Sequence, residues 1–179
     1  MATRVPERSE AADYYFTYID QISSADIRRT LEAQSADALA ILGGISEQQS
    51  LHRYAPGKWS IREVWSHVTD AERVFTFRAL WFARGLEGEL PSFDQDQAIP
   101  TAAANQRSWR SHLDEFVAVR TATTTLFNSL RDDAWDRRGI ASAKSFTVRS
   151  LAWITAGHAA HHLRLLEERY LGSRLPTDD

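Results

Sequence analysis

Apolar residues recur at helical spacing in four separate stretches of the chain. The first covers residues 25–42 and ends at two consecutive glycines. In the second, Ser60 and Glu63 form the S-x-x-E pattern of a helix start, and no proline or glycine interrupts the chain until Gly85. The pattern predicts helices over residues 25–42 and between Ser60 and Gly85.

Two further helical stretches complete the pattern. The third runs from about Asn105 to Leu130, and its bulky apolar residues fall near a helical period. The fourth begins after Thr147, a residue suited to capping a helix start, and closes at Gly172. No stretch of useful length alternates between polar and apolar residues, and no segment repeats another. The chain is therefore predicted to fold as an all-α four-helix bundle.

The segments outside these helices differ in character. Residues 14–16 form an aromatic run, which either crosses the bundle as an N-terminal extension or forms the first turns of the first helix. Glycines and prolines interrupt residues 85–100, so a long loop is predicted between the second and third helices. Loops of this length are usually functional or mobile, and we expect this one, with Phe93, Asp94 and Asp96, to cross the mouth of a pocket.

Composition adds limits to this picture. With 179 residues, of which 43% are hydrophobic and 25% charged, the chain has the size and balance of one globular domain. We predict a single domain over residues 1–179, with flexible tails at 1–12 and 173–179. The net charge of −3 gives no general attraction to phosphate backbones, and no apolar run is long enough to span a bilayer. We expect no nucleic acid and no membrane as partner, and a cytoplasmic location because the N-terminus lacks an apolar signal core.

The histidines of the last predicted helix are the strongest local signal. Because the chain has no cysteine, a soft-metal site in it would have to use histidine. His158 and His162 are four residues apart and lie on one helical face, about one turn from each other. Leucine and isoleucine residues surround that direction, which indicates that both histidines point inward. His161 falls at the edge of this stripe, nearer to polar residues, and is assigned to the surroundings of the site or to the surface.

His67 has a comparable position in the second helix, where it shares a face with valine, alanine and phenylalanine residues. Three imidazoles from two helices could hold one divalent ion and leave coordination positions open, which is typical of catalytic sites. The alternative is that these histidines are hydrogen-bonded core residues without a metal. His52 and His112 have no partner at ligand spacing, so both are assigned to the surface or to a helix flank.

Charged residues near this face are further candidates. Asp70, one turn beyond His67, could accept the free N–H of a ligand imidazole, or it could be a solvated surface residue. Arg78 lies almost in line with His67 along the apolar face, and a buried arginine needs an anion. Asp94 or Asp96 could supply that anion and pin the loop, or Arg78 could bind a carboxylate of the substrate. Otherwise Arg78 reaches the surface.

Three blocks of the sequence carry a family resemblance. They are KWSIREVWSHVTDAERVFTFRALWFARG, LPSFDQD and AGHAAHHLRLLEERY. In this order they resemble the DinB-like superfamily, which includes YfiT-like metal-dependent hydrolases and thiol S-transferases. The resemblance implies an up-down-down-up topology, frequent homodimers, and a metal held by one histidine of the second helix and the H-x-x-x-H of the last. These positions are His67, His158 and His162.

The leading hypothesis is a metal-dependent enzyme, either a hydrolase or a transferase for a low-molecular-weight thiol, acting on a small-molecule substrate. The alternatives are a non-catalytic metal-binding or stress-response protein, and a bundle whose histidines hold no metal. Imidazole sites accept several divalent ions, so zinc or nickel is expected first, with iron, copper and manganese as further candidates. The thiol reaction rests on the resemblance alone.

Overall fold

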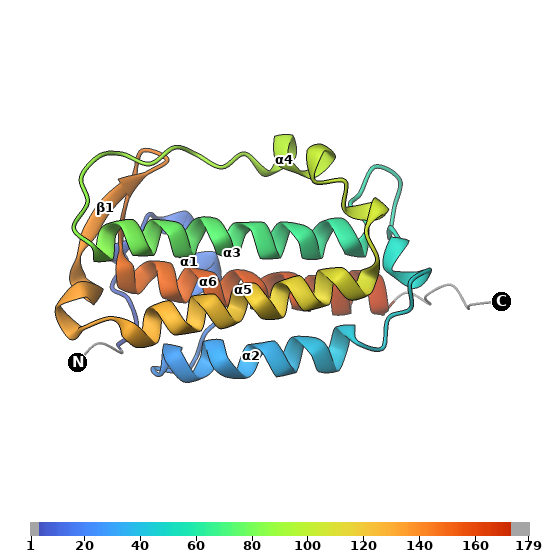
Figure 1. The fold of residues 1–179 in the computed structure, drawn as a ribbon, viewed down its shortest axis with the longest axis horizontal. Coiled ribbons are helices and arrows are strands. Elements are labelled where there is room, and N and C mark those ends of the chain that lie inside the picture. Colours follow the sequence, from blue (N-terminus) through green and yellow to red (C-terminus); the bar gives the residue numbers. More distant parts are fainter. Residues whose placement is uncertain (1–3, 173–179) are drawn as a thin grey trace.

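Four long helices form where the apolar periodicity predicts them. Their bounds are Ile27–Leu42 for α2, Ile61–Ala83 for α3, Trp109–Ser129 for α5 and Val148–Leu166 for α6. In the computed structural model, which describes residues 4–172, α2 and α6 run in one direction and α3 and α5 in the other (Figure 1). The predicted up-down-down-up four-helix bundle is confirmed. No helix within the described residues is long and apolar enough to cross a membrane.

Reciprocal caps fix the starts of α3 and α6. The Ser60 side chain accepts a hydrogen bond from the Glu63 N–H, and the Glu63 carboxylate accepts one from the Ser60 N–H at 2.8 Å. Thr147 and Ser150 form the same arrangement at the start of α6. Each cap satisfies backbone donors that a helix start would otherwise leave free, so the first turn of each helix is set by local sequence.

The helices pack in a ring. α3 contacts α5 and α6, and α2 contacts the same two helices from the opposite side. Two buried clusters fill the interior. One lies toward the end of α3 and contains Phe82, Trp135 and Trp153, whereas the other lies toward its start and contains Trp65 and Phe116. Because α3 and α6 are antiparallel, the start of α3 and the end of α6 share one end of the bundle (Figure 1).

The connections contain more structure than the sequence indicated. Short helical segments are η1 (Arg8–Glu10), η2 (Asp13–Tyr15), α1 (Phe16–Ile19), η3 (Gln49–Leu51), α4 (Gln95–Ala102), η4 (Ala104–Gln106), η5 (Asp132–Asp136) and η6 (Glu167–Leu171). The predicted long loop does leave α3 at Gly85, but α4 forms within it and lies over α3 (Figure 1).

A hairpin that the sequence did not predict precedes α6. Strands β1 (Arg138–Ala141) and β2 (Lys144–Thr147) are antiparallel, with Arg138 opposite Thr147. The two turn residues, Ser142 and Ala143, have φ angles of 53° and 55°. Short hairpin turns of this kind usually carry glycine or asparagine, so the sequence lacked the residues that normally announce one. The strands are also too short to show an alternating pattern.

The N-terminal segment crosses the bundle rather than extending α2. α1 runs against α6, and a Cβ atom at Gly157 would lie only 2.1 Å from the Tyr18 carbonyl oxygen. Glycine therefore permits this close crossing. Glu10, which the sequence placed in a flexible tail, is buried and pairs with Arg149 at 2.9 Å. Residues 173–179, the other predicted tail, lie outside the described residues.

A buried ion pair connects α3 to α5. The Arg120 Nε and Nη2 donate to the two Glu72 carboxylate oxygens at 2.8 and 2.7 Å. Both side chains are only 2% exposed. Two parallel hydrogen bonds satisfy the charges that burial removes from water, so neither partner can be lost without exposing the other to an apolar interior.

Replacing Glu72 with alanine leaves Arg120 buried without a counter-charge, which should lower the free energy of unfolding by about 3–5 kcal/mol. Urea denaturation followed by circular dichroism measures the difference. Asp114→Ala, which removes the exposed partner of Arg110, is the matched control and should leave the midpoint nearly unchanged. Equal shifts in the two variants would contradict a special role for the buried pair.

Candidate metal centre

Three histidines meet in the seam between α3 and α6. His67 lies in the first half of α3, and His158 and His162 lie in the second half of α6. One nitrogen of each ring can be chosen so that all three lie within 4.8 Å of one another. The Nε2 atoms of His67 and His158 are 3.1 Å apart. The structure thus brings together the three residues that the helical spacing and the resemblance singled out.

Burial keeps these imidazoles neutral. The side chains of His67 and His158 are 5% and 4% exposed. Loss of water around the ring lowers the pKa of His67 to about 4 and that of His162 to about 3. The pKa of His158 also falls well below its ordinary value, first because of burial and then because of the neighbouring His162 and His67. At neutral pH each ring therefore has a free lone pair, which is the form that binds a metal.

The donor set fits a divalent ion. No carboxylate of the described residues joins the three histidines in this group, and the chain has no cysteine. The His162 Nδ1 is buried and has no hydrogen-bond partner among the described residues. An unpaired buried ring nitrogen is costly in an ordinary core, and three neutral imidazoles that approach one another this closely suit a bound cation.

Aromatic rings enclose the histidines. Trp59 lies 5.3 Å from His67, and Phe75 lies 5.6 Å from His158, measured between ring centroids. Tyr18 of α1 contacts His158 with a centroid distance of 5.2 Å. Tyr18 was not among the residues predicted from the sequence, although Gly157, in the middle of α6 and next to His158, was a usable signal of a close backbone approach.

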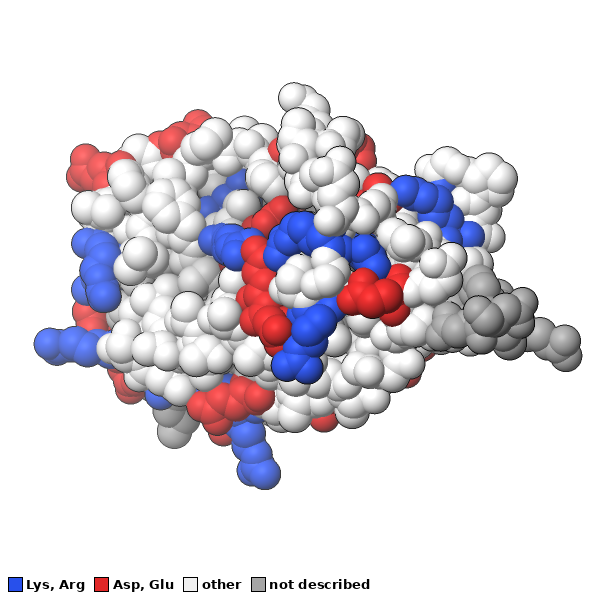
Figure 2. Space-filling model, turned by 45° about the vertical axis from the view of Figure 1, so that its right-hand side comes forward, with Lys and Arg blue, Asp and Glu red and all other residues white. Residues whose placement is uncertain are grey.

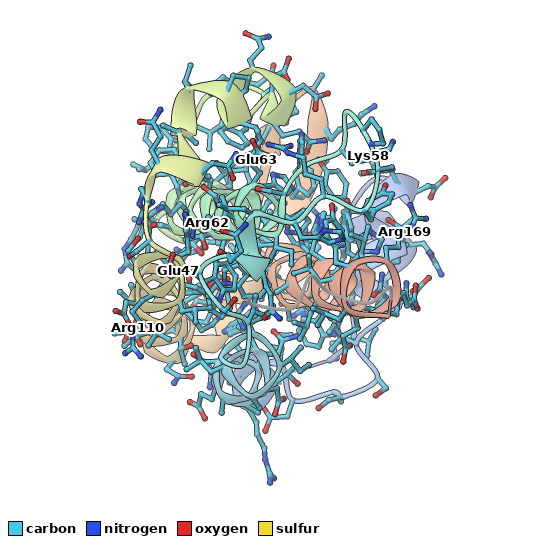
Figure 3. All side chains as sticks on the ribbon, turned by 90° about the vertical axis from the view of Figure 1, so that its right-hand side faces the viewer. Glu47, Lys58, Arg62, Glu63, Arg110 and Arg169 are labelled. Carbon is cyan, nitrogen blue, oxygen red and sulfur yellow. The ribbon has the colours of Figure 1, made fainter. Side chains whose placement is uncertain are left out.

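Two cavities reach the three histidines. One, of about 110 Å³, borders His67 and His158, and the other, of about 320 Å³, borders His162. Gln95, the first residue of α4, lines both. The segment after α3 therefore crosses the mouth of the site, as expected. The larger cavity is also lined by Lys58, which lies in the segment before α3 at the end of the bundle drawn in Figure 3.

Asp70 does not contact the histidines. Its carboxylate accepts a hydrogen bond from Arg73 at 3.0 Å, and Arg73 also pairs with Glu115 at 2.6 Å. Figure 2 shows the surface setting of such groups, with basic and acidic side chains side by side on the face it presents. The proposed contact with a ligand imidazole is thus not formed, because the half-exposed Arg73 offers a closer and oppositely charged partner.

The loop acids and His161 also have other partners. Asp94 is exposed and caps the start of α4, where it accepts hydrogen bonds from the Asp96 and Gln97 N–H groups. Asp96 lines the larger cavity. Burial lowers the pKa of His67, and the negative charge of Asp96 raises it by a smaller amount. His161 is outside the group of three, and its Nδ1 lies 3.3 Å from the Gln21 Nε2.

Arg78 is buried, as its position on the apolar face suggested, but not with the predicted acid. It is 3% exposed, and its Nη2 donates to the Pro91 carbonyl at 2.9 Å and to the Ser142 hydroxyl at 3.0 Å. Arg78 therefore holds the loop through a backbone carbonyl rather than through Asp94 or Asp96. It lines the smaller cavity together with His67 and His158.

His112 is buried in the core, whereas the sequence assigned it to the surface or to a helix flank. It is 1% exposed, and its Nε2 lies 2.9 Å from the Ala104 carbonyl oxygen. The reason is that η4 folds back over the first turns of α5, which the helical period alone does not reveal. The ring belongs to the core of this end of the bundle and not to the group of three.

Comparison with known proteins gives the family. A sequence model of the DinB superfamily matches residues 30–166, and the chain belongs to this superfamily. No curated protein matches it significantly. Among solved structures, YfiT from Bacillus subtilis matches with a TM-score of 0.66 and 17% sequence identity, covering 93% of each chain. YfiT is described as a probable metal-dependent hydrolase with an unusual four-helix bundle topology, and the likeness shows that this chain shares its fold.

The metal-free protein should lose stability as the pH falls from 7 to 5. Histidines in the unfolded chain bind protons with a pKa near 6.5, whereas folded His67 and His162 stay neutral down to about 4 and 3. Between these pKa values the unfolded state binds more protons than the folded state. The free energy of unfolding therefore decreases as the pH decreases, by up to about 1.4 kcal/mol per pH unit for each histidine. Urea denaturation of chelator-treated protein at several pH values measures this slope.

His67→Gln removes one of these groups and should flatten the slope between pH 6.5 and 5. His161→Gln is the matched control, because its ring is more exposed and should contribute less. A slope that is the same in His67→Gln and wild type would show that the imidazoles of the seam do not resist protonation.

Proposed function

We propose that this protein is a metal-dependent enzyme in which His67, His158 and His162 hold one divalent ion and act on a small-molecule substrate. The convergence of three neutral imidazoles, two of them buried and the third partly buried, with no carboxylate among them carries the proposal. Three protein ligands leave coordination positions free, as in catalytic zinc sites, whereas structural sites are closed by a fourth. The absence of a fourth ligand within the described residues favours an enzyme over a non-catalytic metal protein.

The surrounding residues suit a reaction. A divalent ion at this position would supply Lewis acidity and lower the pKa of a water or thiol bound to it. Tyr18, Trp59 and Phe75 exclude bulk water from the histidines. Each cavity is lined by at least one of the three histidines, and Gln95 lines both. We expect the residues that line these cavities to bind the substrate and to transfer protons.

Hydrolysis is the first candidate reaction. The description of YfiT as a probable metal-dependent hydrolase supports it, because the two proteins share their fold. Transfer of a low-molecular-weight thiol uses the same open position and remains the second candidate. Zinc or nickel suits a neutral three-imidazole site best, while carboxylate-preferring ions such as magnesium and calcium suit it least.

Metal content tests the proposal directly. Protein purified without a histidine tag should contain about one divalent ion per chain, and His67→Ala, His158→Ala and His162→Ala should each lose most of it. His161→Ala, which alters an adjacent histidine outside the group, should retain it. Mass spectrometry of elements in dialysed samples measures the ratio. Equal metal content in wild type and His158→Ala would refute the site.

We also propose that the protein forms a homodimer through the outer face of α3. Phe77 and Leu80 are 50% and 37% exposed there. Neighbouring apolar side chains on a surface are typical of protein interfaces. Light scattering coupled to size exclusion should give twice the chain mass for wild type and the single mass for Phe77→Asp. Leu39→Asp, on α2, is the control and should stay dimeric, whereas a monomeric wild type would contradict the proposal.

A further inference from the structure

Arg78 differs from the other buried arginines of the protein. The buried arginines among residues 4–172 are Arg62, Arg78, Arg120 and Arg149. Arg62 pairs with Glu47, Arg120 with Glu72 and Arg149 with Glu10. Figure 3 shows the first of these pairs at the end of the bundle.

No described carboxylate forms an ion pair with Arg78. Its acceptors, the Pro91 carbonyl and the Ser142 hydroxyl, are neutral. The Tyr15 side chain is a further hydrogen-bonding partner, and burial raises the pKa of its hydroxyl, so that group is neutral as well. Removing a guanidinium from water without an anion is unfavourable, so this fold retains a charge that the chain itself does not neutralise.

The unpaired charge faces the site. Arg78 lines the cavity that borders His67 and His158, and none of the described residues that line this cavity is aspartate or glutamate. Its walls are mainly aromatic, with Tyr14, Tyr15, Tyr18, Phe75 and Phe93. A ligand in this space therefore meets a cation, a set of imidazoles and apolar rings. That combination favours an organic anion with an apolar body.

Arg78 is also held in a fixed orientation. Its Nη2 is bound to the loop at Pro91 and to the hairpin turn at Ser142. Those two segments are joined to each other, because the Leu90 N–H donates to the Ile140 carbonyl and the Ser142 N–H donates to the Leu90 carbonyl, each at 3.0 Å. Neutral acceptors thus orient the guanidinium and leave its charge available, which reduces the ordering cost of binding a ligand.

We propose that Arg78 binds the carboxylate of the substrate and directs the rest of the molecule toward His67 and His158. This inference rests on the proposed function, because the role of Arg78 in a reaction requires that the histidines hold the metal at which the substrate reacts. Because Pro91 and Ser142 take both Nη2 hydrogens, Nε and Nη1 are the donors left for a ligand, and the single negative charge of a carboxylate matches the single unpaired guanidinium. Phosphate sites usually combine several donors, such as the free backbone N–H groups of a helix start. Gln95, the first residue of α4, lines this cavity, but the next two N–H groups of that helix start already donate to the Asp94 carboxylate.

The test uses chelator-treated protein, so that a carboxylate cannot bind through a metal. Benzoate is the probe, and titration calorimetry measures its affinity. Benzoate should bind wild type, and Arg78→Gln should weaken binding by about 10- to 100-fold, the usual loss for a charge-assisted hydrogen-bonded pair. Arg84→Gln, at the end of the same helix and outside the cavity, is the matched control and should bind as wild type does.

Two further arms separate the charge from other causes. Benzamide, which has the same shape without the charge, should bind much more weakly than benzoate, and inorganic phosphate should not compete. Arg78→Lys keeps the charge but loses the planar guanidinium and its fixed donor geometry, so its affinity should lie between those of wild type and Arg78→Gln.

Equal benzoate affinity in wild type and both Arg78 variants, no benzoate binding at all, or equal binding of benzamide would overturn the inference. Competition by phosphate at the same concentration would replace carboxylate with phosphate as the ligand class. These outcomes are independent of metal content. A protein that binds benzoate through Arg78 but never holds metal refutes only the proposed function, and a metal-loaded protein indifferent to Arg78 refutes only the carboxylate site.

Discussion

The antiparallel packing of α3 against α6 is the constraint on which the site depends. It brings the start of one helix beside the end of the other, so that His67 meets His158 and His162 although 91 residues separate the first two. The caps at Ser60 and Thr147 fix where these helices begin, and therefore which residues face the seam. A shift of one residue in either helix would turn a histidine by about 100° and out of the group.

Burial in this seam determines the chemistry of the imidazoles. Surrounding rings remove water, which depresses the histidine pKa values and leaves neutral nitrogens close together. Gly157 contributes by letting α1 cross α6 near His158, so that Tyr18 covers one side. The segment from Gly85 through α4 covers another. The surroundings of the histidines are therefore completed by α1 and by the segment from Gly85 through α4, whose sequences show no clear helical periodicity.

The buried charges divide into two kinds. Glu72 with Arg120 and Glu10 with Arg149 are matched pairs that connect helices or attach the N-terminal segment, and they are complete within the chain. Arg78 has neutral acceptors and a cavity instead. The other buried arginines of residues 4–172 are neutralised by carboxylates. Arg78 instead lines a cavity beside His67 and His158, where a ligand can supply the anion.

The sequence by itself determined the four helices and the inward direction of the three histidines, because helical periodicity, caps and glycine stops are local properties. It also placed Arg78 on a buried face. Only the tertiary structure decided what these groups meet. Asp70 turns to Arg73, Asp94 caps α4, His112 is covered by η4, and the Ser142 hairpin reaches Arg78. Each of those contacts depends on which side chains or segments lie close together in space. The spacing of residues along the chain carries no information on these distances.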